Sequence, residues 1–185
     1  NFGGIWERGI RSVKDHIKRV IGQTLLTYEE FFTVLACIEA CLNSRPITSL
    51  GNDPNDLLPL TPGHFLIGEP PALIIEPDYT EIKLNRLSRY QLIEQMRQHF
   101  WRRWHKEYLT TLQQIPKWQK ATDTNLETGA MVIVKEDNLP PLQWKLGRVQ
   151  ETFPGTDDVV RVVNVKTASG VFKRPVNKLC KLPIN

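Results

Sequence analysis

The chain has 185 residues, of which 41% are apolar, and this suffices for one domain or two small domains with a folded core. No apolar run approaches the roughly 18 residues of a membrane-spanning helix, so the sequence argues against a membrane span. The formal net charge of +4 is unevenly placed, with five acids and no Lys or Arg in residues 51–80 but nine bases and three acids in residues 81–120. The basic segment is a candidate phosphate-facing surface, and a solvated helix face is the alternative.

Cysteine and histidine usage argues against a disulfide framework and a zinc site. Cys37 and Cys41 lie four residues apart on an apolar helix, and Cys180 is near the end of the chain. An odd count without framework spacing favours reduced thiols and an intracellular protein. No CxxC occurs and the four histidines are scattered, so a metal site built from these residues is not expected.

A first helix is predicted over residues 6–21, with Gly22 suited to its C-terminal cap. One of its stripes is polar and consists of Glu7, Arg11, Lys14 and Lys18. A separate stripe is apolar and consists of Trp6, Ile10, Val13, Ile17 and Val20. A single acid at the start of a basic helix suits a metal-dependent nucleic-acid enzyme. The alternative is an ordinary helix pair of Glu7 and Arg11, worth about 0.2–0.5 kcal/mol.

A second helix is predicted up to about Asn43, with Thr27 and Glu30 forming a capping box at its start and Pro46 ending it. The expected apolar stripe is Phe31, Leu35, Ile38 and Leu42. Residues 46–82 are rich in Pro, Gly, Asn and Asp, and they predict an extended linker with a short ordered piece at 64–68.

A third helix is predicted over residues 85–114, because apolar and aromatic residues recur every three or four positions there. These residues are Leu87, Tyr90, Ile93, Met96, Phe100, Trp104 and Tyr108. The other faces carry Arg89, Arg97, Arg102, Arg103 and Lys106. Trp101 and Trp104 beside two arginines allow base stacking, but core packing is the favoured interpretation of these aromatics.

From about residue 127 the apolar period changes from helical to alternating. Strands are predicted at 130–135, 143–153, 159–167, 171–174 and 178–181, separated by Pro-, Gly- and Asp-containing turns. Both sides of the third strand are largely apolar, so we expect it to be internal. Five short strands in about 60 residues predict a small barrel of the SH3-like type.

Several motifs in the chain resemble, in the same order, the C-terminal part of the integrase in the Pol polyprotein of BEL/Pao-type LTR retrotransposons. The first group is FGGIWE, SVKDHIKRVIG, LTYEE, LNSRPI and LTPGHFLIGEPP, which resembles the end of the integrase core. The second group is HFWRRWHKEYL, LQQIPKW, VIVKEDNLPPLQWKLGRV and VRVVNVKTASGVFKRPVNKLCKLP, which resembles the C-terminal region. The resemblance covers nearly the whole chain.

The resemblance implies DNA integration by phosphoryl transfer, with two Mg²⁺ or Mn²⁺ ions held by two Asp and one Glu. Glu7 matches the catalytic and metal-binding Glu, and Arg11 and Lys14 match basic residues that contact the DNA end. Both aspartates and the zinc-binding domain belong upstream of Asn1. We therefore expect a fragment that is inactive alone, because one ligand of three cannot hold a metal pair.

The predicted class is α+β. Residues 1–70 are expected to be the remnant of an RNase H-like integrase core, 71–120 a linker with the long basic and aromatic helix, and 121–185 a five-stranded SH3-like C-terminal domain. The candidate DNA-binding residues are Arg11, Lys14, Lys18, Arg102, Arg103, Lys145, Arg148, Lys173 and Arg174. Because acids nearly balance the bases of the last domain, we expect weak, salt-sensitive DNA binding there.

The expected partners are element and target DNA, the remainder of the Pol polyprotein and, in the complete integrase, further copies of the same protein. No membrane partner is expected, and a nuclear location follows from action on genomic DNA. Two alternatives remain open. One is a non-enzymatic relic or domesticated module that binds nucleic acid or protein, and the other is a pure protein-interaction module that does not bind DNA.

Overall fold

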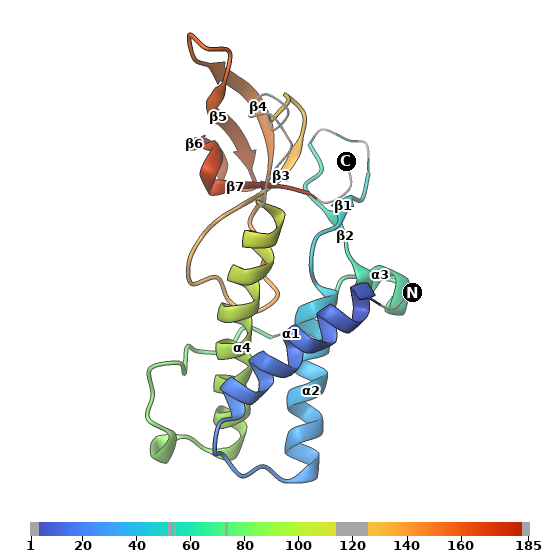
Figure 1. The fold of residues 1–185 in the computed structure, drawn as a ribbon, viewed down its shortest axis with the longest axis vertical. Coiled ribbons are helices and arrows are strands. Elements are labelled where there is room, and N and C mark those ends of the chain that lie inside the picture. The colour runs from blue at the N-terminus through green and yellow to red at the C-terminus, as the bar shows by residue number, and fades with distance from the viewer. Residues whose placement is uncertain (1–3, 52, 54, 73, 114–125, 183–185) are drawn as a thin grey trace. The chain divides into compact units, whose positions relative to one another are not determined.

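The computed structural model describes residues 4–51, 53, 55–72, 74–113 and 126–182, without the side chains of residues 4–9 and 12. It combines helices with an antiparallel sheet, so the predicted α+β class is confirmed (Figure 1). Contacts divide the chain into two compact units. Unit 1 comprises residues 1–42, 72–106 and 140–142, and unit 2 comprises residues 43–71, 107–139 and 143–185. The three-part division inferred from the sequence stays a prediction.

Unit 1 contains the first two helices, and both form where local signals predict them. Helix α1 spans Gly4–Ile21 and ends at Gly22, whose φ of 57° lies in the left-handed region and whose N–H bonds to the Lys18 carbonyl at 3.1 Å. Helix α2 spans Tyr28–Asn43. Its capping box is confirmed, since the Glu30 N–H donates to Thr27 Oγ1 at 3.3 Å and the Thr27 N–H donates to Glu30 Oε2 at 2.8 Å.

The buried face of α2 differs from the predicted one. Val34, Ile38 and Cys41 are buried, whereas Phe31 and Leu35 are 39% and 36% exposed. The prediction is confirmed for Ile38 and wrong for Phe31 and Leu35. Because α2 is apolar on more than one side, periodicity alone does not select the face that packs. Phe32 is also exposed, at 63%. The helix therefore keeps a solvent-facing apolar patch of Phe31, Phe32 and Leu35.

The long helix α4 spans Arg89–Leu112, and its residues up to Lys106 belong to unit 1. It begins four residues after the predicted start because Ser88 caps it. Ser88 Oγ accepts the Gln91 N–H at 3.2 Å, and Gln91 Oε1 accepts the Ser88 N–H at 2.9 Å. The residues before this cap form the separate short helix η1, Leu84–Arg86. The predicted end at residue 114 lies outside the described residues.

Residues 92–98 of α4 are all buried, although four of these seven side chains are polar or charged. Gln95 and Gln98 bond to the loop before η1: Gln95 Nε2 donates to the carbonyls of Tyr79 (2.6 Å) and Ile82 (2.7 Å), and Gln98 Nε2 donates to that of Pro77 (2.8 Å). The Tyr79 N–H donates back to Gln98 Oε1 at 2.8 Å. These bonds offset the cost of burying two amides and fix the loop on the helix.

Glu94 and Arg97 form an ion pair whose side chains are only 8% and 4% exposed. The sequence placed Arg97 on a polar face of the helix, and the structure corrects this by burying it at 3% exposure. Burial opposes ionisation of the carboxyl and raises the pKa of Glu94, although Arg97 acts in the opposite direction. The pair therefore holds together groups that would each be costly to bury alone.

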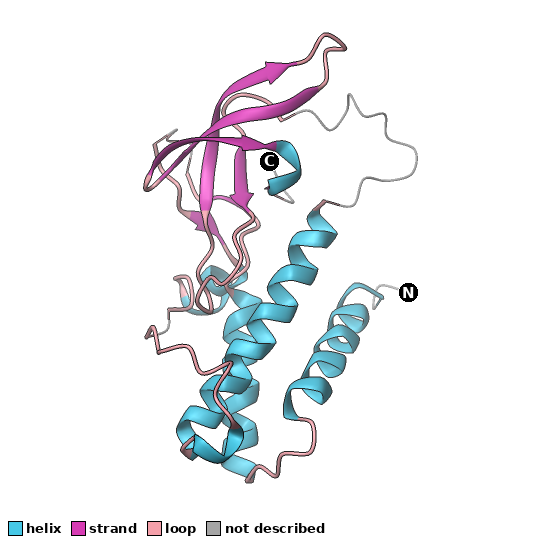
Figure 2. Ribbon diagram, turned by 90° about the vertical axis from the view of Figure 1, so that its left-hand side faces the viewer, coloured by secondary structure: helices cyan, strands magenta, loops and turns pink. Residues whose placement is uncertain are grey.

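Unit 2 contains the five-stranded antiparallel sheet, whose strand order is β6-β5-β4-β3-β7. The strands are β3 Met131–Val134, β4 Leu146–Pro154, β5 Val160–Thr167, β6 Gly170–Pro175 and β7 Leu179–Lys181. The short helix η3, Val176–Lys178, links the last two strands. All five predicted strands are confirmed within a few residues, and β5 is internal as expected. The sheet curls into a half-barrel (Figure 2).

Strand β3 is buried on both faces, which explains its continuous apolar sequence. Val132 and Val134 enter one core cluster with residues of β4 and β5, such as Val149 and Val165. The alternate residues Met131 and Ile133 enter a second cluster with Leu109 of α4, Cys180 and Leu182. The last turns of α4 thus pack against the sheet within unit 2.

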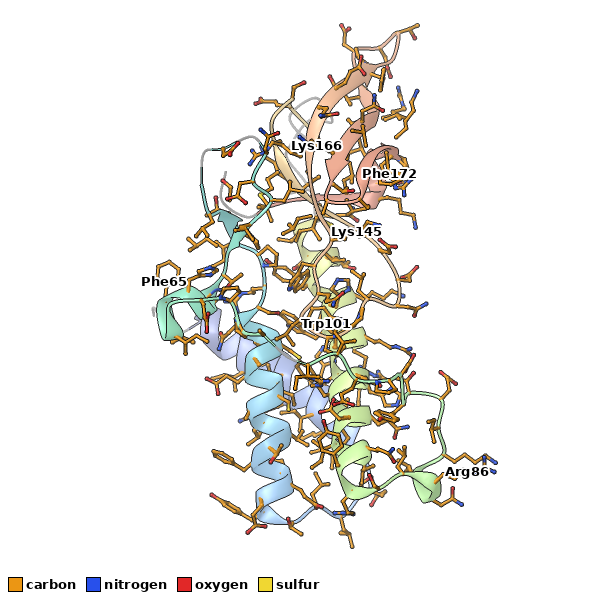
Figure 3. All side chains as sticks on the ribbon, turned by 180° about the vertical axis from the view of Figure 1, so that it is seen from behind. Phe65, Arg86, Trp101, Lys145, Lys166 and Phe172 are labelled. Atoms are coloured by element: carbon orange, nitrogen blue, oxygen red, sulfur yellow. The ribbon has the colours of Figure 1, made fainter. Side chains whose placement is uncertain are left out.

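The Pro-rich segment of unit 2 is more ordered than the predicted linker. It holds a two-stranded pairing of β1 (Thr48–Ser49) with β2 (Pro59–Leu60) and the helix α3 (Pro62–Ile67). Helix α3 confirms the short ordered piece predicted at 64–68 within a few residues. Phe65 of α3 is 72% exposed and points outward (Figure 3). No helix in the described part of the chain is long and apolar enough to cross a membrane.

Replacing Gly147 with alanine is expected to destabilise unit 2 by about 2–4 kcal/mol. The added Cβ would lie 2.4 Å from Val165 Cγ1 and 3.0 Å from the Lys166 carbonyl oxygen, so β4 and β5 would have to separate. Gly51→Ala is the matched control, because its nearest neighbour would be an Asp56 oxygen at 3.7 Å. Urea unfolding measures both, and equal stabilities of the two variants would contradict the expectation.

Removing one member of the buried pair is expected to cost about 3–5 kcal/mol, as Glu94→Ala or as Arg97→Ala, because the other charge is left buried. The double variant Glu94→Leu/Arg97→Met is expected to lose much less. The exposed pair of Asp157 and Arg161 is the control, since solvent screens it. Chemical denaturation of all variants gives the coupling free energy. If the loss of stability in the double variant equals the sum of the two single losses, the two charges do not act as a pair.

Candidate nucleic-acid interface

The basic stripe of α1 is presented to solvent. Arg11, Lys14 and Lys18 are all exposed, at positions that one helix face shares. No carboxylate among the described side chains forms an ion pair with them. Glu7 lies in the same helix, but its side chain is outside the described residues. Their exposure makes these three bases candidates for contact with an external polyanion.

The described side chains contain no group of three or more His, Cys, Asp or Glu that could hold a metal ion. A divalent pair needs several hard oxygen ligands. This statement does not extend to Glu7, whose side chain lies outside the described residues.

The two tryptophans of the HFWRRWHKEYL motif are core residues. Trp101 is 1% and Trp104 is 8% exposed, and their ring centroids are 5.9 Å apart. Figure 3 shows Trp101 among the side chains of the helical region. This confirms core packing and excludes these rings as an open stacking platform for bases.

The two arginines between the tryptophans differ in their surroundings. Arg102 Nη2 donates to Asp78 Oδ2 at 2.8 Å, and its Nη1 lies 3.9 Å from Glu81. Hydrogen bonds from Thr80, and the nearby Arg102 charge, lower the pKa of Asp78. Arg103 is exposed, and no described carboxylate pairs with it. Of the two, Arg103 is the better candidate for an anionic ligand.

Two predicted DNA-binding residues of the sheet have structural contacts instead. Lys145 forms an ion pair with Glu136. Arg148 donates to the Gly129 carbonyl at 2.9 Å and to the carbonyls of Asp53 (3.3 Å) and Asp56 (3.2 Å). Arg148 thereby ties the acidic loop at residues 53–56 to the sheet within unit 2.

Lys173 and Arg174 lie on the edge strand β6. The Lys173 ammonium is 4.4 Å from the centre of the Phe153 ring, and the Arg174 guanidinium is 5.3 Å from that of Phe172. Because successive strand residues point to opposite faces, the two bases do not form one patch. Each offers a cation held against an aromatic ring on its own side of the sheet.

One feature of unit 1 was not predicted from the sequence. A cavity of about 710 Å³ opens between residues 19–24, residues 80–84 and one side of α4 that includes His99 and Arg103. These segments lie far apart in the sequence, and no motif links them. An excess of bases over acids in residues 81–120 was the only sequence signal, and it did not indicate a concave site.

The comparisons with known proteins give one match. A family model described as a family of unknown function, DUF5641, matches residues 88–182. No curated protein matches the chain, and no solved structure matches it. The matched segment starts at Ser88, the capping residue of α4, and extends through β7, so it covers α4 and the whole five-stranded sheet. Because this segment is more than half of the chain, the protein belongs to the family DUF5641.

Proposed function

We propose that this chain is the C-terminal part of a BEL/Pao-type retrotransposon integrase, which binds DNA and takes part in its integration within the complete Pol polyprotein. The observation that carries the proposal is the exposed stripe of Arg11, Lys14 and Lys18, which follows Glu7 at helical spacing. A cationic stripe of this kind attracts phosphates. The order of the sequence motifs supports the same assignment.

Within this proposal, unit 1 contains helices of an RNase H-like core and the sheet of unit 2 is an SH3-like barrel. The exposed Phe31, Phe32 and Leu35 support the first part, because such a patch on α2 needs further protein to cover it. The curled antiparallel sheet of five short strands supports the second. The expected covering protein is the remainder of the integrase.

The proposed chemistry assigns Glu7 as one ligand of Mg²⁺ or Mn²⁺. The metal pair supplies charge stabilisation of the attacking and leaving oxygens in phosphoryl transfer. The residues of this chain would act on the DNA: Arg11 and Lys14 would hold phosphates near Glu7, and Lys18 would extend the contact by one turn. The complete protein would act in the nucleus, on element ends and target DNA, as an assembly of several copies.

The alternative is a binding module without enzymatic activity. One observation favours it: the family match covers α4 and the sheet but not α1. In that case Lys173, Arg174 and Arg103 would be the main candidates for nucleic-acid contacts, and Glu7 would have no catalytic role. A module that contacts only proteins would bind no DNA.

The triple variant Arg11→Ala/Lys14→Ala/Lys18→Ala is expected to weaken duplex DNA binding and to reduce the slope of log K against log salt by about 2–3, since each phosphate contact contributes about 0.9. The matched control removes three exposed bases elsewhere, Arg86, Arg161 and Lys181. Fluorescence anisotropy at several salt concentrations measures both. Equal slopes for the two variants would show that α1 is not the DNA-binding surface.

The chain alone, incubated with Mg²⁺ or Mn²⁺ and element-end DNA, is expected to form no strand-transfer product, because the proposal assigns the other two carboxylate ligands to the remainder of the integrase. A complete integrase that includes this segment is expected to lose strand transfer on Glu7→Gln while retaining DNA binding. If the isolated chain forms joined products, and Glu7→Gln abolishes them, the proposal that the other two metal ligands belong to the remainder of the integrase is refuted. Unchanged strand transfer by the complete Glu7→Gln protein would refute the role of Glu7.

A further inference from the structure

The cavity in unit 1 has walls from three segments. One wall is the end of α1 with the turn at residues 22–24, the second is the segment 80–84, and the base is α4. Its volume of about 710 Å³ lies within the roughly 300–1,000 Å³ typical of small-ligand sites. It therefore has room for a ligand of nucleotide size.

Hydrogen bonds fix the second wall on α4 and set the shape of the turn in the first wall. Gln95 fixes the second wall through the Tyr79 and Ile82 carbonyls, at 2.6 and 2.7 Å. In the first wall, the Gly22 N–H bonds to the Lys18 carbonyl at 3.1 Å, and the Thr24 N–H bonds to that of Ile21 at 3.0 Å. The cavity is thus preformed, which reduces the ordering cost of binding.

The charged residues that line the cavity are all bases. Arg19, Lys83 and Arg103 are exposed, one from each wall and one from α4, and His99 lies deeper. No Asp or Glu is among the lining residues. Asp78 and Glu81 pair with Arg102, although their charges also act on His99. Three exposed cations with no carboxylate among the lining residues favour an anionic ligand.

The interior of the cavity is partly apolar. Val20 and Ile21 of α1, Ile82 and Leu84 of the second wall, and Met96 of α4 contribute this surface. Burial, together with the charges of Arg102 and Arg103, lowers the pKa of His99, although Glu81 and Asp78 act in the opposite direction. The neutral imidazole, which is thereby favoured, can both donate and accept a hydrogen bond. A ligand suited to this site carries an anionic group and a flat, largely apolar group with polar edges.

We propose that this cavity binds a nucleotide, with its phosphate held by Arg19, Lys83 and Arg103 and its base lying against Ile82 and Met96. The inference goes beyond the proposed function, because a free nucleotide could bind here whether or not the chain takes part in integration. The nucleotide has two sources that share this chemistry. It is either a free mononucleotide or an unpaired terminal nucleotide of a DNA or RNA strand.

The test is a titration of the full chain with AMP, in which calorimetry measures the affinity and ¹H–¹⁵N NMR locates the binding. AMP is expected to bind at least about tenfold more tightly than adenosine or inorganic phosphate alone, because only AMP uses both parts of the site. The largest shifts are expected at Gly22, Ile82 and Met96. A 5′-phosphorylated single-stranded oligonucleotide, titrated in parallel, distinguishes the two sources.

Two kinds of variant locate the binding. Lys83→Ala and Arg103→Ala are each expected to weaken AMP binding about tenfold. Arg86→Ala is the matched control, because Arg86 is an exposed base of the neighbouring η1 that does not line the cavity and points away from α4 (Figure 3). Leu84→Trp keeps every charge but places a larger side chain in the cavity, so it is expected to abolish AMP binding. Because Leu84 is 59% exposed, the fold should tolerate the change.

Each outcome supports or overturns the proposal. AMP binding that Leu84→Trp abolishes and Arg86→Ala preserves supports a free-nucleotide site. If only the oligonucleotide binds, and Leu84→Trp abolishes its binding while Arg86→Ala preserves it, the result supports the terminal nucleotide of a strand as the ligand. No binding of either ligand at millimolar concentration, or an equal loss in Arg86→Ala, overturns the proposal. If Leu84→Trp abolishes AMP binding but leaves the affinity for duplex DNA unchanged, the nucleotide site is distinct from the DNA-binding stripe of α1, which supports the proposal.

Discussion

The burial of seven consecutive residues in α4 is the constraint on which unit 1 depends. Four of these side chains, Glu94, Gln95, Arg97 and Gln98, are polar or charged and must find partners away from water. The two charges pair with each other, and the two amides take their partners from backbone groups of residues 77–82. A loop that would otherwise be a flexible connection is therefore fixed on the helix, and it becomes one wall of the cavity.

Local signals predicted most of the elements. The capping box of Thr27 and Glu30, the left-handed Gly22 and the alternating strands of unit 2 depend on residues close together in the sequence. Such local signals gave a wrong prediction where two of them pointed to different structures. Apolar periodicity predicted that α4 starts at residue 85. The hydrogen bonds between Ser88 and Gln91 cap its N-terminus instead, so the helix starts at Arg89. On α2, several apolar faces were available, and packing buried Val34 and Cys41 in place of the predicted Phe31 and Leu35.

The candidate interface shows why charge alone is a weak guide to binding. Arg102, Lys145 and Arg148 looked equivalent to Arg11 and Lys14 in the sequence. Their partners are distant in the sequence: Asp78 for Arg102, Glu136 for Lys145 and the carbonyls of residues 53 and 56 for Arg148. A base that already holds a carboxylate or a carbonyl must give up that bond to contact a phosphate, so its net contribution to binding is small. Exposure without a described acidic partner therefore ranks Arg11, Lys14 and Arg103 above Arg102, Lys145 and Arg148.

The extent of the family match has a structural consequence. Residues 88–182 include the sheet with its core and the complete helix α4, but not the carbonyls of residues 77–82 that satisfy Gln95 and Gln98. A protein with only the matched segment would leave these two buried amides without their backbone partners on one side of α4. The matched segment thus lacks partners in both units, because residues 43–71 of unit 2 supply Leu57 to the second core cluster and the Pro46 carbonyl that accepts from Tyr108 Oη. Any protein that carries it needs an equivalent of the preceding loop, or a partner that supplies carbonyl groups to this side of the helix.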